Sequence, residues 1–149
     1  MKNRINVVVF TLFLLINACS NKYNKETLSF KKYMQEQFNT DIEDGNYVLI
    51  PLNICHTCIE TIGDILLVTF NKKNKIILID YTSTTINNYK SKYLEGYKVY
   101  KDNKMNLVKQ NIISGNNIYV FKIQNHKLID KIKFIRGKNE NEIKQFLLK

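Results

Sequence analysis

The sequence has few of the residues from which metal centres and active sites are usually built. It contains no tryptophan, one proline, two histidines and three cysteines in 149 residues. A zinc site needs about four ligands, and the side chains available are Cys55, His56, Cys58 and the distant His126, which falls in a predicted turn. We therefore predict no metal site, and metal transfer, for example of copper, remains a minor alternative.

Other common catalytic patterns are missing as well. There is no glycine-rich phosphate loop, no serine nucleophile elbow and no pair of carboxylates with an evident role. A c-type haem site needs a histidine directly after the second cysteine of a pair, but Ile59 follows Cys58. The cysteines are therefore the main source of chemistry.

The charge balance is strongly positive, with 23 lysines and arginines against 13 acidic residues. Such an excess can indicate nucleic acid, anionic lipid or acidic partners. Here the positive residues are spread along the chain. Lysine, asparagine and isoleucine are all abundant, as expected where codon usage is rich in A and T, so codon usage can explain the excess of lysine. We predict no nucleic-acid partner.

The N-terminus has the features of an export signal. Lys2 and Arg4 form a positive start, and residues 7–16 are almost all apolar but too few to span a bilayer. The box Ile16-Asn17-Ala18-Cys19 resembles the bacterial lipoprotein signal, in which the cysteine is acylated and becomes the new N-terminus. An ordinary cleaved signal that leaves a spare thiol is the alternative.

The resemblance implies a signal peptide at 1–18, lipidation of Cys19 and a short tether at 19–24. Several acyl chains would anchor the protein stably, because one chain alone gives marginal attachment. We expect an exported protein, lipid-anchored in the bacterial cell envelope on the outer side of the cytoplasmic membrane or on the outer membrane. The resemblance to bacterial lipoproteins implies that Ser20, directly after Cys19, weakly favours the outer membrane where the cell has one.

Cys55 and Cys58 are then the only thiols left, in an exported protein where oxidised pairs can form and persist. They lie in Cys55-His56-Thr57-Cys58, directly after an apolar run and directly before residues with helical spacing. A pair this close encloses too small a loop to staple a domain. Two thiols at a strand-to-helix junction indicate a redox pair.

Apolar periodicity predicts one domain at 25–149 built from strands and helices. The expected helices are 25–39, 57–71, 84–94 and 139–148, and the expected strands are 47–52, 75–80, 97–100, 118–123 and 128–135. Segment 101–114 is polar and unassigned. Alternating strands and helices predict a parallel sheet with right-handed crossovers, and the asparagine-containing turn at 124–127 predicts an antiparallel hairpin.

This order of elements resembles the thioredoxin fold over 47–149, and it looks most like the short membrane-tethered thioredoxin-like lipoproteins of bacteria. The resemblance implies an α/β three-layer sandwich, with helices on both sides of a mixed sheet of about four to five strands. It also implies that Cys55 is the exposed nucleophile and Cys58 the resolving thiol, with their disulfide in place of a separate cofactor.

The chemistry supports these roles. Backbone N–H groups and the positive dipole end at a helix start favour the thiolate, which is the species that attacks disulfides. A cationic imidazole at His56 would further stabilise the Cys55 thiolate and tune its pKa, although His56 could equally be an exposed spacer. Thr57 is more simply a helix-start residue than a chemical participant.

Three features of thioredoxins are missing. A cis-proline normally precedes the first strand of the hairpin and faces the cysteines, but the only proline here is Pro51. The matching substrate-facing loop contains Gly115, Asn116 and Asn117. The tryptophan before the motif and the buried acid of the preceding strand are also absent.

The main prediction is an envelope lipoprotein with thiol-disulfide oxidoreductase activity. Its partners would be exported protein thiols or disulfides and a redox partner, with the membrane bound through the lipid anchor. The alternative, suggested by the three missing features, is a non-catalytic thioredoxin-like lipoprotein that acts as a binding or scaffold module.

Overall fold

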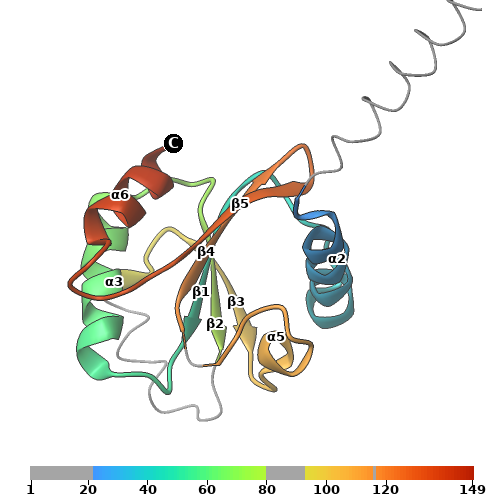
Figure 1. Ribbon diagram of the computed structural model, residues 1–149, viewed down its shortest axis with the longest axis horizontal. Helices are drawn as coiled ribbons and strands as arrows, with labels where there is room; N and C mark the ends of the chain where they lie inside the picture. The colour runs from blue at the N-terminus through green and yellow to red at the C-terminus, as the bar shows by residue number, and fades with distance from the viewer. Residues whose placement is uncertain (1–21, 80–92, 116) are drawn as a thin grey trace, which may run out of the picture.

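The computed structural model describes residues 22–79, 93–115 and 117–149. The described elements are α2 (Asn24–Phe38), β1 (Gly45–Pro51), α3 (His56–Val68), β2 (Lys75–Ile79), β3 (Lys98–Asp102), α5 (Asn106–Lys109), β4 (Tyr119–Gln124), β5 (Lys127–Lys133) and α6 (Glu140–Leu148). One sheet has the strand order β3-β2-β1-β4-β5. The first three strands of the chain run parallel, and β4 and β5 add an antiparallel hairpin. With helices on both faces, this is the predicted thioredoxin-like α/β fold (Figure 1).

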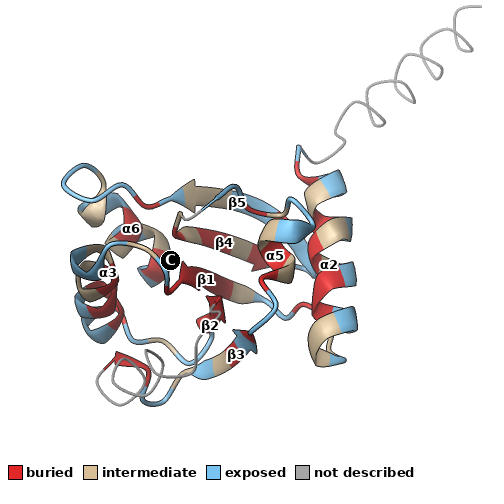
Figure 2. Ribbon diagram, turned by 90° about the horizontal axis from the view of Figure 1, so that it is seen from below, coloured by how far each residue is buried: buried red, intermediate tan, exposed pale blue. Residues whose placement is uncertain are grey.

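The central strands are buried on both faces (Figure 2). In β1, Tyr47 and Leu49 pack with Phe30 of α2, whereas Val48 and Ile50 pack with residues of α3 and α6. These four β1 side chains have no exposed surface. Two layers of helices therefore explain why β1 and β2 read as continuous apolar runs, since alternate residues face two different cores.

The end of α3 differs from the sequence prediction. The helix expected to reach 71 ends at Val68, because the Thr69 backbone leaves the helical conformation and its hydroxyl donates to the Ile65 carbonyl oxygen at 2.8 Å. Asn71 then begins the turn that leads to β2, with its side chain accepting the N–H of Lys73 at 2.9 Å.

The segment left unassigned at 101–114 contains the end of β3 and the short helix α5. Asp102, buried at the end of β3, accepts the backbone N–H groups of Asn106 and Leu107 at 3.0 and 2.9 Å. This carboxylate satisfies two of the N–H groups that a helix start leaves unpaired. The predicted helix 84–94 falls mostly at 80–92, outside the described residues.

The first turn of α2 is attached to the start of β5. The Thr27 hydroxyl accepts the N–H of Leu128 at 3.0 Å, and Glu26 forms an ion pair with Lys131 at 2.9 Å. The hairpin turn ahead of Leu128 has two residues with positive φ, Asn125 and His126, as a tight turn between antiparallel strands requires.

His126 joins this hairpin turn to the loop before β1. Its N–H donates to the Asp44 carboxylate at 3.0 Å, and its ring nitrogen Nδ1 lies 2.8 Å from the Ile42 carbonyl oxygen. Its position in a turn agrees with the sequence expectation, and its contacts stabilise the end of the sheet at which β1 begins.

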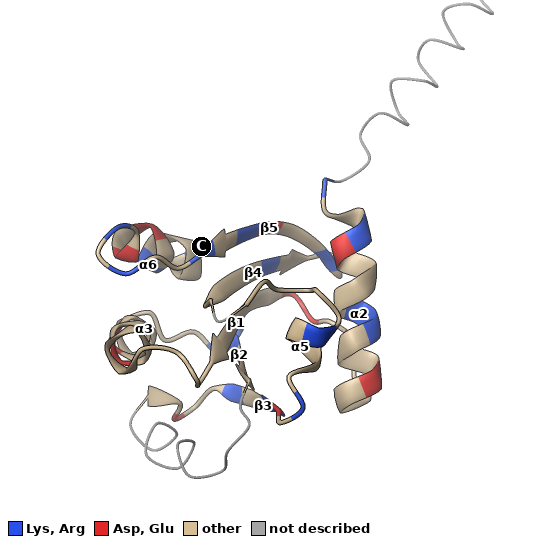
Figure 3. Cartoon of the chain, turned by 60° about the horizontal axis from the view of Figure 1, so that its bottom comes forward, with Lys and Arg blue, Asp and Glu red and all other residues tan. Residues whose placement is uncertain are grey.

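The described lysines and arginines are distributed over several helices and strands (Figure 3). Among the described residues, no helix is both long enough and apolar enough to span a membrane.

Candidate functional site

The cysteine pair lies at the start of α3 and forms a disulfide with an S–S distance of 1.99 Å. Cys55 is the residue that caps the helix, and its Sγ accepts the N–H of Cys58 at 3.2 Å. Cys55 is exposed and Cys58 is half-buried. The strand-to-helix junction predicted from the sequence therefore presents one sulfur to solvent and shields the other.

The sheet and α3 together determine this placement. β1 ends at Pro51, and the N–H of Leu52 still reaches the Ile79 carbonyl oxygen of β2 at 2.9 Å before the chain turns toward α3. The helix is then fixed by an apolar face that includes Ile59 and Ile62. The cysteines therefore lie at the carboxyl end of a central parallel strand, where α/β proteins commonly bind ligands.

A pocket of about 330 Å³ opens beside the disulfide. Its lining consists of Asn53, Ile54, Cys55, Cys58, Asn117, Ile118, Phe134 and Arg136. Ile118 and Phe134 are almost fully buried and are joined by a backbone hydrogen bond of 3.0 Å. The pocket is therefore mainly apolar, with two amide side chains and one charged side chain.

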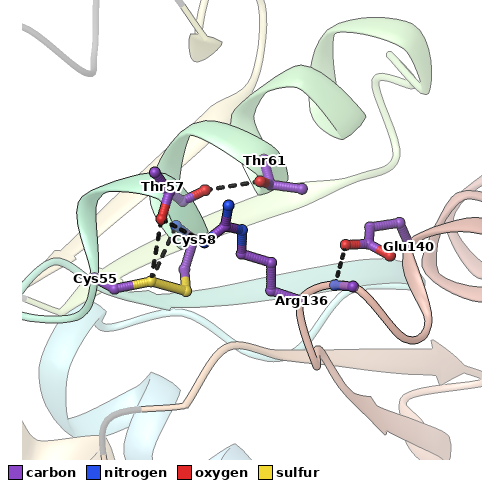
Figure 4. The surroundings of a disulfide bond; sticks show 7 residues. Cys55, Thr57, Cys58, Thr61, Arg136 and Glu140 are labelled. Carbon is purple, nitrogen blue, oxygen red and sulfur yellow. Dashed lines mark hydrogen bonds between the residues drawn. A yellow bond between two sulfur atoms is a disulfide. The ribbon is translucent and has the colours of Figure 1, made fainter.

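The charged side chain belongs to Arg136, in the loop between β5 and α6 (Figure 4). Its Nη1 donates to the Thr57 hydroxyl oxygen at 2.8 Å, and that oxygen lies 3.7 Å from the Cys55 Sγ. No sequence pattern marks Arg136 as a site residue, and Thr57 was predicted only as a helix-start residue. The structure connects both to the sulfur that would react.

The loop that carries Arg136 is held by its own hydrogen bonds. The Asn139 side chain accepts the N–H of Ile135 and donates to the Lys133 carbonyl oxygen, both at 2.8 Å, and the Glu140 carboxylate accepts the N–H of Gly137. That last bond is the main reason why the pKa of Glu140 is lowered, and the charge of Arg136 contributes further. A fixed loop therefore sets where the guanidinium can reach.

The remaining predicted site residues are placed less centrally. The His56 side chain is 85% exposed, and its Nε2 lies 3.4 Å from Glu60, one helical turn further on. Gly115 has a positive φ but does not line the pocket, whereas Asn117 does. Asn116 lies outside the described residues.

Three features of the described residues bear on the chemistry. Every peptide bond between described residues is trans. No group of three or more histidine, cysteine or acidic side chains is arranged to hold a metal ion in the described part of the chain. The described pocket lining also contains no carboxylate.

No protein-family model matches the chain, and no curated protein matches it. Among solved structures, a putative thiol:disulfide interchange protein of Chlorobium tepidum has a TM-score of 0.49 and 14% identity, covering 69% of this chain and 76% of that one. A thioredoxin-like protein of Aeropyrum pernix has a TM-score of 0.46 and 14% identity, covering 70% and 78%.

The thioredoxin domain of a thiol-disulfide oxidoreductase of Bacteroides vulgatus has a TM-score of 0.44 and 16% identity, covering 69% of this chain and 79% of that one. The strand order, the mixed sheet and the disulfide at the start of α3 define the fold of this chain by themselves.

Proposed function

We propose that this protein is a thiol-disulfide oxidoreductase that acts through Cys55 and Cys58 on protein thiols or disulfides. The observation that carries the proposal is the asymmetry of the pair: Cys55 is exposed at the helix start, and Cys58 is half-buried in the same disulfide. An exposed sulfur beside an open pocket can be reached by a protein substrate. Its half-buried neighbour is less accessible and lies in position to attack a mixed disulfide formed at Cys55.

The exchange balances without a separate cofactor. In the reduced protein, the Cys55 thiolate attacks one sulfur of a substrate disulfide, forming a mixed disulfide and releasing the other substrate sulfur as a thiolate. Cys58 loses its proton to solvent and attacks the Cys55 sulfur, which re-forms the Cys55–Cys58 disulfide and releases the second substrate thiolate. Two electrons pass from the cysteine pair to the substrate, and the reverse sequence oxidises a dithiol.

The start of α3 supports this role for Cys55. The N–H of Cys58 already points at the Cys55 sulfur at 3.2 Å, and this donor would equally stabilise a thiolate. The charge of Arg136, transmitted through the Thr57 hydroxyl, acts in the same direction. Cys55 is therefore the favoured nucleophile and Cys58 the favoured resolving thiol.

Trapping the mixed disulfide tests the proposal. The full chain carrying Cys58→Ser, reduced and purified in detergent, should form a stable mixed disulfide with an unfolded protein that contains a disulfide. The matched Cys55→Ser variant should form none, and the unmodified chain should show a reversible two-electron couple in a glutathione titration. A chain that forms no trapped species and shows no such couple would be no oxidoreductase.

The protein is also proposed to be exported and anchored through acyl chains on Cys19. The support is the positive start, the apolar run and the cysteine that follows Ala18. Metabolic labelling with palmitate should label the full chain and fail to label Cys19→Ser, while Ser20→Ala should still be labelled. Equal labelling of the unmodified chain and of Cys19→Ser would exclude this anchor.

A non-catalytic binding role is the second candidate, and one observation favours it. The described pocket lining has no carboxylate that could relay a proton to Cys58. A binding module predicts that Cys55→Ala leaves the cellular phenotype unchanged. A phenotype as severe as deletion of the whole gene would instead support the redox role.

A further inference from the structure

Arg136 is the only charged side chain among the described residues that line the pocket beside the disulfide. The rest of that lining is apolar or amide, apart from the two sulfurs themselves. An apolar pocket with one fixed cation favours a ligand that is apolar in part and carries one negative charge. The substrate segment must also bring a sulfur to Cys55, so these requirements apply to the residues next to the substrate cysteine.

The guanidinium of Arg136 has more hydrogen-bond donors than its bond to Thr57 uses. It has five N–H groups, of which one donates to the Thr57 hydroxyl. That bond holds the guanidinium beside the first turn of α3, where the Thr57 oxygen lies 3.7 Å from the Cys55 sulfur (Figure 4). A carboxylate that approaches Cys55 can accept the remaining N–H groups, in the paired geometry that arginine favours.

The nearby acidic group does not occupy this position. Glu140, the first residue of α6, interacts electrostatically with Arg136, but its carboxylate accepts the backbone N–H of Gly137 in the preceding loop. Arg136 reaches in the opposite direction, toward Thr57 and the disulfide (Figure 4). The charge on the disulfide side of the loop is therefore positive.

We propose that the pocket selects protein segments in which an acidic residue lies next to the reacting cysteine, with Arg136 binding the acidic side chain. This rests on the proposed exchange at Cys55 and specifies its substrate class. Ile54, Ile118 and Phe134 take an apolar side chain of the same segment, and Asn53 and Asn117 supply amide groups to the lining. Arg136 is a specificity-determining residue, because it contacts the substrate without changing which bonds are made or broken.

The experiment uses matched peptide disulfides and the full reduced chain in detergent. Three peptides differ only at the residue next to the cysteine, which is Asp, Asn or Lys, and 2-hydroxyethyl disulfide serves as a neutral small probe. We expect the Asp peptide to react about two- to fivefold faster than the Asn peptide, the range that an exposed ion pair supplies, and the Lys peptide to react more slowly. The ratio of the Asp-peptide rate to the Asn-peptide rate should decrease in concentrated salt, because salt screens exposed charges.

The variants separate this pocket from the overall charge of the protein. Arg136→Gln should bring the Asp-to-Asn ratio close to one, and Arg136→Glu should reverse the preference in favour of the Lys peptide. Lys138→Gln removes the same charge from the same loop but from a residue outside the pocket lining, so it should leave the ratio unchanged.

An unchanged ratio in Arg136→Gln, or an equal loss of the ratio in Lys138→Gln, would overturn the assignment of the acidic subsite. So would equal rates for the three peptides in the unmodified chain. Failure of the neutral probe to react with the unmodified chain would instead refute the proposed exchange itself, so the two failures are distinguishable.

Discussion

Replacing Thr57 with valine should destabilise the thiolate of Cys55 and so raise the pKa of its thiol. Arg136 donates to the Thr57 oxygen, so the hydroxyl proton of Thr57 is left to point elsewhere, and the Cys55 sulfur lies 3.7 Å away. Hydrogen bonds to charged groups contribute about 1.5–3 kcal/mol. The exposure of Cys55 and the length of this contact reduce the expected value to about 1 kcal/mol, after screening by solvent.

A loss of about 1 kcal/mol corresponds to roughly 0.7 pH units, since one pH unit is equivalent to 1.36 kcal/mol. In a Cys58→Ala background, the rate of alkylation by iodoacetamide should rise with pH, and Thr57→Val should move the midpoint upward by about this amount. Thr57→Ser keeps the hydroxyl and serves as the matched control. The reduction potential of the otherwise unmodified chain should become more negative by roughly 20 mV.

Equal midpoints in Thr57→Val and Thr57→Ser, with both variants folded normally, would exclude a stabilising hydrogen bond from Thr57 to the Cys55 sulfur. The Thr57 hydroxyl would then act only on the position of Arg136 and not on the sulfur. A midpoint that moves downward in Thr57→Val would contradict the direction of the effect.

The other predictions concern stability, measured by urea unfolding. Gly45→Ala should destabilise the protein by about 2–4 kcal/mol, because φ is +122° and an added Cβ would lie 2.1 Å from the Lys73 carbonyl oxygen; an unchanged midpoint would show that the strand start can shift. Asp102→Asn should cost about 1–3 kcal/mol, since the two N–H groups of α5 are bonded to different carboxylate oxygens and an amide has only one oxygen, and retention of full stability would exclude the cap. The Lys98 hydrogen bond lowers the pKa of Glu43, so Glu43 contributes stability above its ordinary pKa of 4.5 that is lost as pH falls through the lower folded value. Glu43→Gln should therefore be less stable than the unmodified chain at pH 6 and equally stable at the acid end, and a constant difference between the two pH values would contradict this linkage.

The sheet and its main helices could be predicted because each is specified by local residue patterns. The apolar run of β1 packs on both faces, so it has the continuous pattern of a buried parallel strand, and α3 has its apolar residues at helical spacing. The short helix α5 could not be predicted, because its start depends on Asp102 and on a left-handed backbone at Met105. Four residues are too few for apolar periodicity to show.

Distance along the sequence explains why the cysteine pair could be predicted and Arg136 could not. Cys55 and Cys58 are neighbours in the sequence, and their positions between a strand and a helix can be read locally. Arg136 lies 79 residues from Thr57, and the hairpin of β4 and β5 must fold onto β1 before the two meet. One arginine after a strand does not differ in pattern from the many other basic residues of the chain.

The attachment of α2 to the hairpin has a consequence for orientation at a membrane. Thr27 bonds the start of β5, and the hairpin turn lies beside the residues where β1 begins. Cys55 follows the opposite end of β1, after a strand of seven residues that spans about 23 Å. Asn24 lies five positions after Cys19 in the sequence, and this stretch can extend to roughly 18 Å at most. A lipid on Cys19 would therefore hold the hairpin end of the domain near the bilayer and direct the disulfide outward, so its partners would be soluble proteins or domains that project from the membrane.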